Sequence, residues 1–147
     1  MPTTKKESFG KLSDGRETSV YTLRNTKGNE LKVTDYGARI VSMRFRDKNF
    51  DNKFLLKSYP DASGYENDSE SGIVYVDGDA KKFAQIIWNG ETFTEGVRFT
   101  AEVDGTRAEV VYSLSNDNEI SIKYKATGAS DISTQLVFSA DALPDSE

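Results

Sequence analysis

The side chains best suited to chemistry in this sequence are carboxylates near its middle. Asp77 and Asp79 flank a glycine, and Glu66, Asp68 and Glu70 lie in one short polar stretch. Paired carboxylates can act as general acid and base on sugars. Acidic residues two positions apart around a glycine are, however, much more often solvated turn residues. We therefore favour a turn there over a catalytic pair.

Aromatic rings are the other candidates for contact with a ligand, because the apolar face of a sugar stacks on such rings. The competing interpretation is that Trp88 and Tyr75 belong to a core or a sheet face, since aromatic side chains fit pleated surfaces. We favour the core interpretation. We expect any sugar site to lie on the concave face of a sheet, with candidate residues Trp88, Tyr59, Tyr65, Tyr75, Asp77 and Asp79.

Composition limits the cofactors and partners that need to be considered. The sequence has no cysteine, which excludes disulfides, thiolate nucleophiles and cysteine-ligated metals. The acidic stretch lacks the ligand spacing of a calcium-binding loop, so we expect no metal and no cofactor. The net charge is −5 and no basic run is present, so we expect neither nucleic acid nor membrane as a partner. The opening MPTTKKESFG lacks an apolar signal core, and we expect one cytoplasmic domain spanning residues 1–147.

The clearest local pattern is a hairpin near the start of the chain. Tyr21 and Leu23 alternate with polar residues, as do Leu31 and Val33, which is typical of half-buried strands. Pairing Leu23 with Leu31 and Tyr21 with Val33 leaves a three-residue loop, 26–28. Its glycine, Gly28, falls where a left-handed backbone is needed.

Three further strands follow between residues 97 and 126, with one apolar face each. The alternating apolar positions are Val97, Phe99, Ala101 and Val103, then Ala108, Val110, Tyr112 and Leu114, then Ile120, Ile122, Tyr124 and Ala126. A two-residue turn at 104–105 joins the first two strands. A two-residue turn at 116–117 would set Glu119 against Leu114 and invert the face, whereas a three-residue loop at 116–118 pairs Leu114 with Ile120. We favour the three-residue loop.

The remaining chain also reads as short strands and turns. We expect a frayed segment at 1–8, strands at 39–45, 54–56, 72–76, 83–88 and 132–138, a hairpin turn at Asn89-Gly90 leading into 91–94, and a polar loop at 57–71 carrying a helical turn. No helical period or internal repeat is present. The fold class is therefore all-β, with roughly ten short antiparallel strands at the spacing of a β-sandwich.

Several of these stretches resemble the start of an aldose 1-epimerase, the galactose mutarotase family. The similar segments are Phe9-Gly10 with Asp14-Gly15, the Asn-x-x-Gly turn, Asp35-Tyr36-Gly37-Ala38, Ile40–Met43 with Asp47, and Tyr112-Ser113-Leu114 through Tyr124-Lys125-Ala126-Thr127. The resemblance implies a galactose mutarotase-like β-sandwich, here a truncated form of the family's supersandwich. These stretches specify strands and turns, so they support the fold more than the activity.

The residues that the resemblance would assign to catalysis are missing. The family uses a glutamate and a histidine as base and acid, with a second histidine and an arginine holding the sugar, and this sequence has no histidine. Phe138 or Ser139 stands where the acid histidine is expected, and neither replaces imidazole near neutral pH. The Gly-Arg block expected after Gly72 and the Leu-His-Gly-Gly block expected between Phe93 and Val97 are absent. We also expect the region with the glutamate to be lacking, so no residue is assigned as catalytic.

Three functions from different classes follow. The first, which we favour, is a non-catalytic mutarotase-like domain that binds a carbohydrate or a partner carrying one. The second is an interaction or scaffolding domain that keeps only the fold. The third is an aldose 1-epimerase that uses atypical residues, which the missing histidine disfavours.

The resemblance also bears on assembly. A full mutarotase closes its sheets with later strands, so we expect open sheet edges around the 132–138 strand. Open edges invite pairing with another chain. We favour a homodimer about a two-fold axis, and the alternative is a monomer whose edges are covered by the 57–71 loop or the N-terminal segment.

We predict that the protein does not accelerate mutarotation of common aldoses, because the sequence contains no histidine. The measurement is the optical rotation of fresh α-D-glucose or α-D-galactose with and without protein. A rate above that of buffer, retained on repurification and lost on unfolding, would contradict the prediction.

Overall fold

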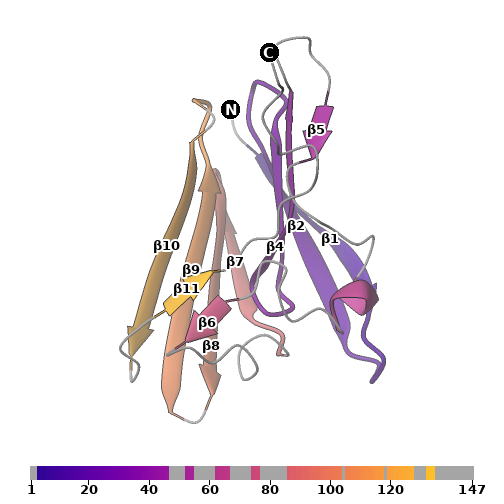
Figure 1. Ribbon diagram of the computed structural model, residues 1–147, viewed down its shortest axis with the longest axis vertical. Coiled ribbons are helices and arrows are strands. Elements are labelled where there is room, and N and C mark those ends of the chain that lie inside the picture. The colour runs from indigo at the N-terminus through magenta and orange to yellow at the C-terminus, as the bar shows by residue number, and fades with distance from the viewer. Residues whose placement is uncertain are drawn as a thin grey trace, which may run out of the picture.

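The computed structural model describes residues 3–46, 52–54, 62–66, 74–76, 86–103, 105–117, 119–127 and 132–134. In these ranges the chain forms two facing antiparallel sheets and a small third one (Figure 1). The first sheet has the order β1-β2-β3-β4-β5: Thr3–Lys11, Glu17–Arg24, Glu30–Thr34, Arg39–Arg46 and Asn52–Phe54. The second has the order β10-β9-β8-β7: Ile120–Thr127, Thr106–Leu114, Gly96–Val103 and Asn89–Phe93. Two short strands, β6 (Val74–Val76) and β11 (Ile132–Thr134), pair with each other.

One 3₁₀ helix, η1 (Ala62–Tyr65), lies within the stretch expected to be a loop with a helical turn. Within the described ranges, no helix has the length and apolar character needed to cross a membrane. The all-β fold class predicted from the strand pattern is confirmed.

The hairpin β2–β3 has the predicted register. Tyr21 pairs with Val33 and Leu23 with Leu31. The Asn25 N–H donates to the Asn29 carbonyl at 3.1 Å, and Gly28 has a φ of 79°, as the three-residue loop requires. The Asn25 side chain holds this loop from inside, because its Oδ1 accepts the N–H groups of Lys27 and Asn29 at 3.1 and 3.0 Å.

The second sheet also has the predicted register. Phe99 pairs with Val110 between β8 and β9, and Leu114 pairs with Ile120 between β9 and β10. The Ser115 N–H donates to the Glu119 carbonyl at 3.0 Å, which leaves a three-residue connection and confirms the preferred alternative. A one-residue slip would have turned the apolar face of β10 outward.

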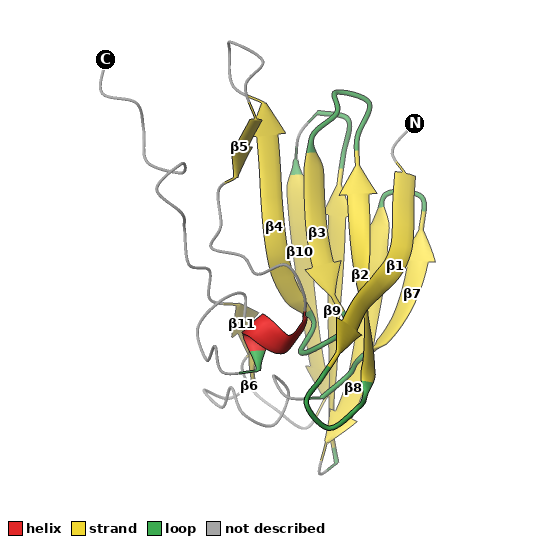
Figure 2. Cartoon of the chain, turned by 90° about the vertical axis from the view of Figure 1, so that its right-hand side faces the viewer, coloured by secondary structure: helices red, strands yellow, loops and turns green. Residues whose placement is uncertain are grey.

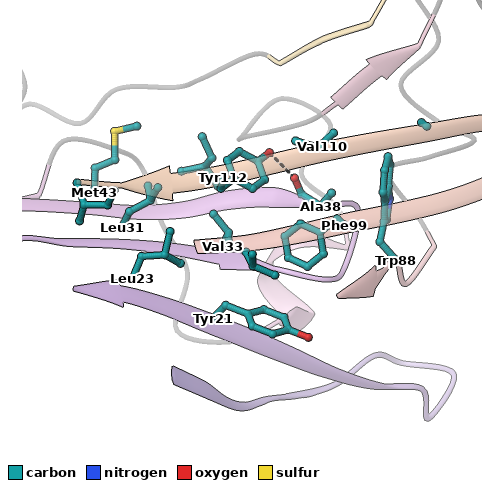
Figure 3. Close-up of a cluster of buried hydrophobic side chains, with 14 residues drawn as sticks. Tyr21, Leu23, Leu31, Val33, Ala38, Met43, Trp88, Phe99, Val110 and Tyr112 are labelled. Atoms are coloured by element: carbon teal, nitrogen blue, oxygen red, sulfur yellow. Dashed lines mark hydrogen bonds between the residues drawn. The ribbon is translucent and has the colours of Figure 1, made fainter. Parts of the chain in front are cut away.

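The main core lies between the two large sheets (Figure 3). The Tyr21 ring meets the Phe99 ring edge-on at 5.4 Å between centroids, and Phe99 meets Tyr112 edge-on at 6.0 Å. The Tyr112 hydroxyl donates to the Ala38 carbonyl across the sandwich at 2.6 Å. A buried hydrogen bond of this kind contributes about 1 kcal/mol, and leaving one partner unmatched costs more.

A second buried cluster covers the opposite face of the first sheet. Its members are Phe9, Leu12, Val20, Tyr36, Val41, Ala62 and Tyr65. The helix η1 supplies Ala62 and Tyr65 and lies against that face (Figure 2). Glu66, at the end of η1, accepts the Ser13 N–H and hydroxyl at 2.7 and 2.6 Å, which joins η1 to the β1–β2 turn.

The segment expected to fray at residues 1–8 is, from Thr3 onward, part of β1. This strand runs antiparallel to β2 from the pair Thr3–Arg24 to the pair Lys11–Glu17. Most of its side chains are exposed, so this segment lacks the alternation of apolar and polar residues that would have predicted a strand. Backbone pairing with β2, rather than side-chain burial, forms this edge strand.

The hairpin turn predicted at Asn89-Gly90 is wrong. Both residues lie inside β7, and the turn lies at 94–95, between the paired Phe93 and Gly96. A Cβ on Gly90 would lie 2.5 Å from Tyr21 Oη and 3.2 Å from Phe99 Cε1. Gly90 therefore provides room for the Tyr21 ring rather than a turn.

The other predicted strands agree with the structure in part. The strand at 39–45 corresponds to β4. Of the strand expected at 54–56, Phe54 is the last residue of β5 (Asn52–Phe54), and residues 55 and 56 lie outside the described residues. The described part of the expected 83–88 strand, residues 86–88, makes one isolated bridge, between Ile87 and Tyr36. For the strands at 72–76 and 132–138, residues 74–76 and 132–134 form β6 and β11, and the rest lies outside the described residues.

We predict that Gly96→Ala lowers the free energy of unfolding by about 2–3 kcal/mol through overpacking. A Cβ at this buried strand position would overlap the Tyr112 carbonyl oxygen and lie 2.9 Å from Ser113 Cα, so backbone must move. Urea denaturation measures the change. Gly90→Ala is the comparison variant and should lower the free energy of unfolding by less, because the tip of the Tyr21 side chain can shift. Equal urea midpoints for wild type and Gly96→Ala would refute this account.

Candidate functional site

The aromatic candidates that the structure describes are buried. Trp88 is 2% exposed in the core between the sheets, and its backbone N–H donates to the Asp35 carbonyl at 2.7 Å. Tyr65 is fully buried in the second cluster, and its hydroxyl donates to the Val41 carbonyl at 3.3 Å. The two rings lie on opposite faces of the first sheet, so they do not form one surface.

The other candidates are Tyr75, Tyr59, Asp77 and Asp79. Tyr75 lies in β6, paired with Ser133 of β11. Tyr59, Asp77 and Asp79 lie outside the described residues, as do residues 135–138 of the strand expected to have an open edge. A saccharide site built on these positions stays a prediction.

A polar groove on the outer face of the second sheet has the composition of a binding site. Since Phe99 and Val110 face the core, the alternate positions on β8, β9 and β10 face outward. Five of these outward side chains line a groove of about 230 Å³: Arg98, Arg107, Glu109, Lys125 and Thr127. They bring guanidinium, carboxylate, ammonium and hydroxyl groups to one concave surface.

One ion pair fixes the carboxylate in this groove. Arg98 binds Glu109 through two contacts of 3.0 Å each, from Nε to Oε1 and from Nη2 to Oε2. The Glu109 side chain is 20% exposed, whereas that of Arg98 is 46% exposed. Two parallel contacts hold a carboxylate in a defined orientation, so Glu109 is an acceptor held in a fixed position.

The other two cations of the groove are Arg107 and Lys125. Among the described residues, neither Arg107 nor Lys125 has a carboxylate oxygen within 4.0 Å. Lys125 lies opposite Glu109 on the neighbouring strand, but that carboxylate is bound by Arg98. The groove therefore presents excess positive charge on a chain whose net charge is −5.

An exposed aromatic ring lies on the same face of the sheet. Phe93 is 44% exposed, and it pairs with Gly96, two positions before Arg98 on β8. Directly opposite residues of an antiparallel pair point to the same side, so Phe93 faces outward with Arg98. Because Gly96 has no side chain, the ring is not covered from the neighbouring strand.

A second groove, on the first sheet, is a weaker candidate. It measures about 260 Å³ and is lined by Thr3, Lys5, Glu7, Thr22, Arg24, Glu30 and Lys32. Its charges are largely matched, since Arg24 lies 2.8 Å from Glu30 and Lys5 lies 3.8 Å from Glu7. Such a surface offers few groups for a ligand.

The buried charged residues have structural roles. Arg39 is 2% exposed, donates to the Tyr65 carbonyl at 3.1 Å and lies over the rings of Tyr36 and Tyr65 at 5.1 and 5.6 Å. Asp35 accepts the Ser19 N–H at 2.9 Å, and burial raises the pKa of its carboxyl, against the opposing effects of this hydrogen bond and of Lys6. No group of three or more acidic, histidine or cysteine side chains within the described ranges could hold a metal ion.

Neither a scan of protein-family models nor a search of curated proteins found a match for this chain. Solved structures do match. One is the crystal structure of a GalM/aldose epimerase homologue from C. elegans, with a TM-score of 0.65 and 17% sequence identity. The similarity covers 78% of this chain and 49% of that one, so the chain spans about half the length of the structure it matches.

The fold is therefore that of the galactose mutarotase-like β-sandwiches. This agrees with the resemblance seen in the sequence, where the matching stretches were strands and turns. At 17% identity the comparison establishes the fold alone.

None of the groove residues was proposed as a binding residue by sequence reasoning, although Lys125 and Thr127 lie in one of the stretches that resemble the mutarotase family. The missed signal is the polar half of the period-2 pattern: Arg98 lies between Val97 and Phe99, and Glu109 between Ala108 and Val110. With the strand register known, these outward positions could have been placed on one face. Their pairing depends on diagonal contacts between strands, which the apolar pattern does not report.

We predict that Asp35→Asn removes a pH-dependent part of the stability. The carboxyl pKa is higher in the folded than in the unfolded state, so its contribution favours folding at low pH and is lost as pH rises through the folded pKa. The stability of the variant relative to wild type should therefore increase between pH 4 and pH 7. Urea denaturation at both pH values measures this, with Asp117→Asn, at an exposed position in the connection between β9 and β10, as the control. A constant difference for Asp35→Asn would contradict the prediction.

Proposed function

We propose that this protein is a non-catalytic mutarotase-fold domain that binds a carbohydrate on the outer face of its second sheet. The observation that carries the proposal is the combination of an exposed ring, Phe93, with a polar groove on the same face. Sugars present apolar ring faces and a rim of hydroxyl groups. Phe93 is a diagonal neighbour of Arg98, at one end of the groove, so an extended saccharide can stack on the ring and reach the fixed donors and acceptors.

The fixed groups of the groove suit hydroxyl recognition. Glu109 is held by Arg98 through two contacts, so its remaining lone pairs can accept hydrogen bonds from a ligand without reorientation. The exposed Arg107, Lys125 and Thr127 add donors around it. Preorganised polar groups reduce the entropy lost on binding.

The absence of catalysis is supported by the residue types. Acid–base opening of a sugar ring needs a group that can donate a proton near neutral pH. The sequence has no histidine, and both oxygens of Glu109, the carboxylate lining the groove, are bound by Arg98. A carboxylate whose two oxygens both accept hydrogen bonds from a guanidinium is poorly placed to donate a proton to a sugar.

An interaction domain that binds no sugar is the second candidate. It is favoured by the burial of Trp88 and Tyr65, the two ligand-binding candidates whose side chains the structure describes. The two functions differ in whether any saccharide shifts resonances of the outer face of β7–β10.

We predict that neutral saccharides, tested as glucose, galactose, maltose, cellobiose and lactose, perturb amide resonances of β7–β10 in an NMR titration. Phe93→Ala should weaken this binding at least about fivefold, because stacking area is lost, without changing the melting temperature by more than a few degrees. Thr92→Ala, at the neighbouring exposed position of β7, is the matched control and should bind as wild type. If no saccharide perturbs these resonances at millimolar concentration, the interaction-domain function is the better account.

A further inference from the structure

We infer that the groove selects carbohydrates carrying an oxyanionic substituent, such as a carboxylate or a sulfate ester, and that Arg107 and Lys125 bind this group. The inference rests on the proposed function and specifies its ligand class. Its basis is the imbalance of charge within the groove. Three cations and one carboxylate line it, and that carboxylate is occupied by Arg98.

The strand register places the two cations around one point. Lys125 lies opposite Glu109, and Arg107 lies opposite Thr127, so Arg107 and Lys125 are diagonal neighbours on one face. Diagonal neighbours of an antiparallel pair are about 7–8 Å apart at the backbone, within reach of long side chains. Both cationic groups can therefore approach a single oxyanion, with the Thr127 hydroxyl as a further donor.

The chemistry of the two side chains favours an oxyanion over a neutral hydroxyl group. A guanidinium donates two parallel hydrogen bonds to carboxylate or sulfate oxygens, and an ammonium adds a mobile point charge. Two like charges held close together repel each other, and an anion between them removes that repulsion. A neutral sugar makes no charge-assisted hydrogen bonds of this kind and does not relieve the repulsion between the two cations.

One carboxylate competes for the same site. Glu102 lies opposite Arg107 on β8, although its oxygens are not within 4.0 Å of that guanidinium. Both residues are exposed, so their attraction is weak and is screened by salt. A ligand oxyanion held by Arg107 and Lys125 together has the advantage of two cations over one.

The experiment compares charged and neutral sugars that share the glucose ring. Glucose, glucuronate and glucose 6-sulfate are titrated by NMR at low ionic strength, with acetate and inorganic sulfate as simple-ion probes. We expect glucuronate, glucose 6-sulfate or both to bind at least about fivefold more tightly than glucose, and 0.5 M NaCl to remove that advantage. The two charged sugars distinguish a carboxylate from a sulfate ester.

Substitutions test the assignment to individual residues. Arg107→Gln and Lys125→Gln should each lower the affinity for the charged sugar towards that for glucose, and Glu102→Gln should not weaken it. Lys123→Gln is the matched control, because Lys123 is an exposed lysine on the same face of β10 that does not line the groove. All four positions are on the surface, and equal melting temperatures would show that the fold is retained.

The outcomes separate the inference from the function on which it rests. Equal affinities for glucose and the charged sugars would overturn the inference and leave carbohydrate binding standing. Acetate or sulfate binding as tightly as the charged sugars would indicate an adventitious ion only and would also overturn it. If no sugar binds at all, both the inference and the proposed function fail.

Discussion

The structure depends on the face-to-face contact of two sheets across a line of aromatic rings. Tyr21 from the first sheet meets Phe99 of the second edge-on, and Phe99 meets Tyr112 in turn. Tyr112, on the second sheet, also contacts the first sheet, because its hydroxyl donates a hydrogen bond to the Ala38 carbonyl. This contact fixes the spacing of the sheets and decides which face of each strand is inside.

Once the inner face is fixed, the outer face follows from the period of a β-strand. Each apolar residue that enters the core leaves its neighbours pointing to solvent, so Arg98 and Glu109 face outward because Phe99 and Val110 face inward. The three-residue connection after Leu114 has the same consequence for β10 and places Lys125 on this surface. The groove is thus a result of core register rather than of a separate motif.

The turn between β3 and β4, which resembles the mutarotase family, contributes to the core and not to the candidate site. The residues that resemble the mutarotase family, such as Asp35, Tyr36 and Gly37, lie at the turn between β3 and β4, and there they organise the core. Trp88 reaches the core because its backbone and that of Ile86 bond to this same turn. The similarity to a known fold therefore does not by itself identify a ligand, because a binding site is defined by particular side chains and not by the fold.

The sequence by itself determined the local features: the all-β class, the pairing of Tyr21 with Val33, the loop closed by Gly28 and the pairing of Leu114 with Ile120. These depend on alternation and turn chemistry within a few residues, which the sequence displays directly. Only the tertiary structure decided that Gly90 accommodates Tyr21 instead of forming a turn, and that Arg98 binds Glu109 on the outer face. Both depend on which strands become neighbours, and the physical reason is that a contact between distant segments is set by packing of the whole sandwich.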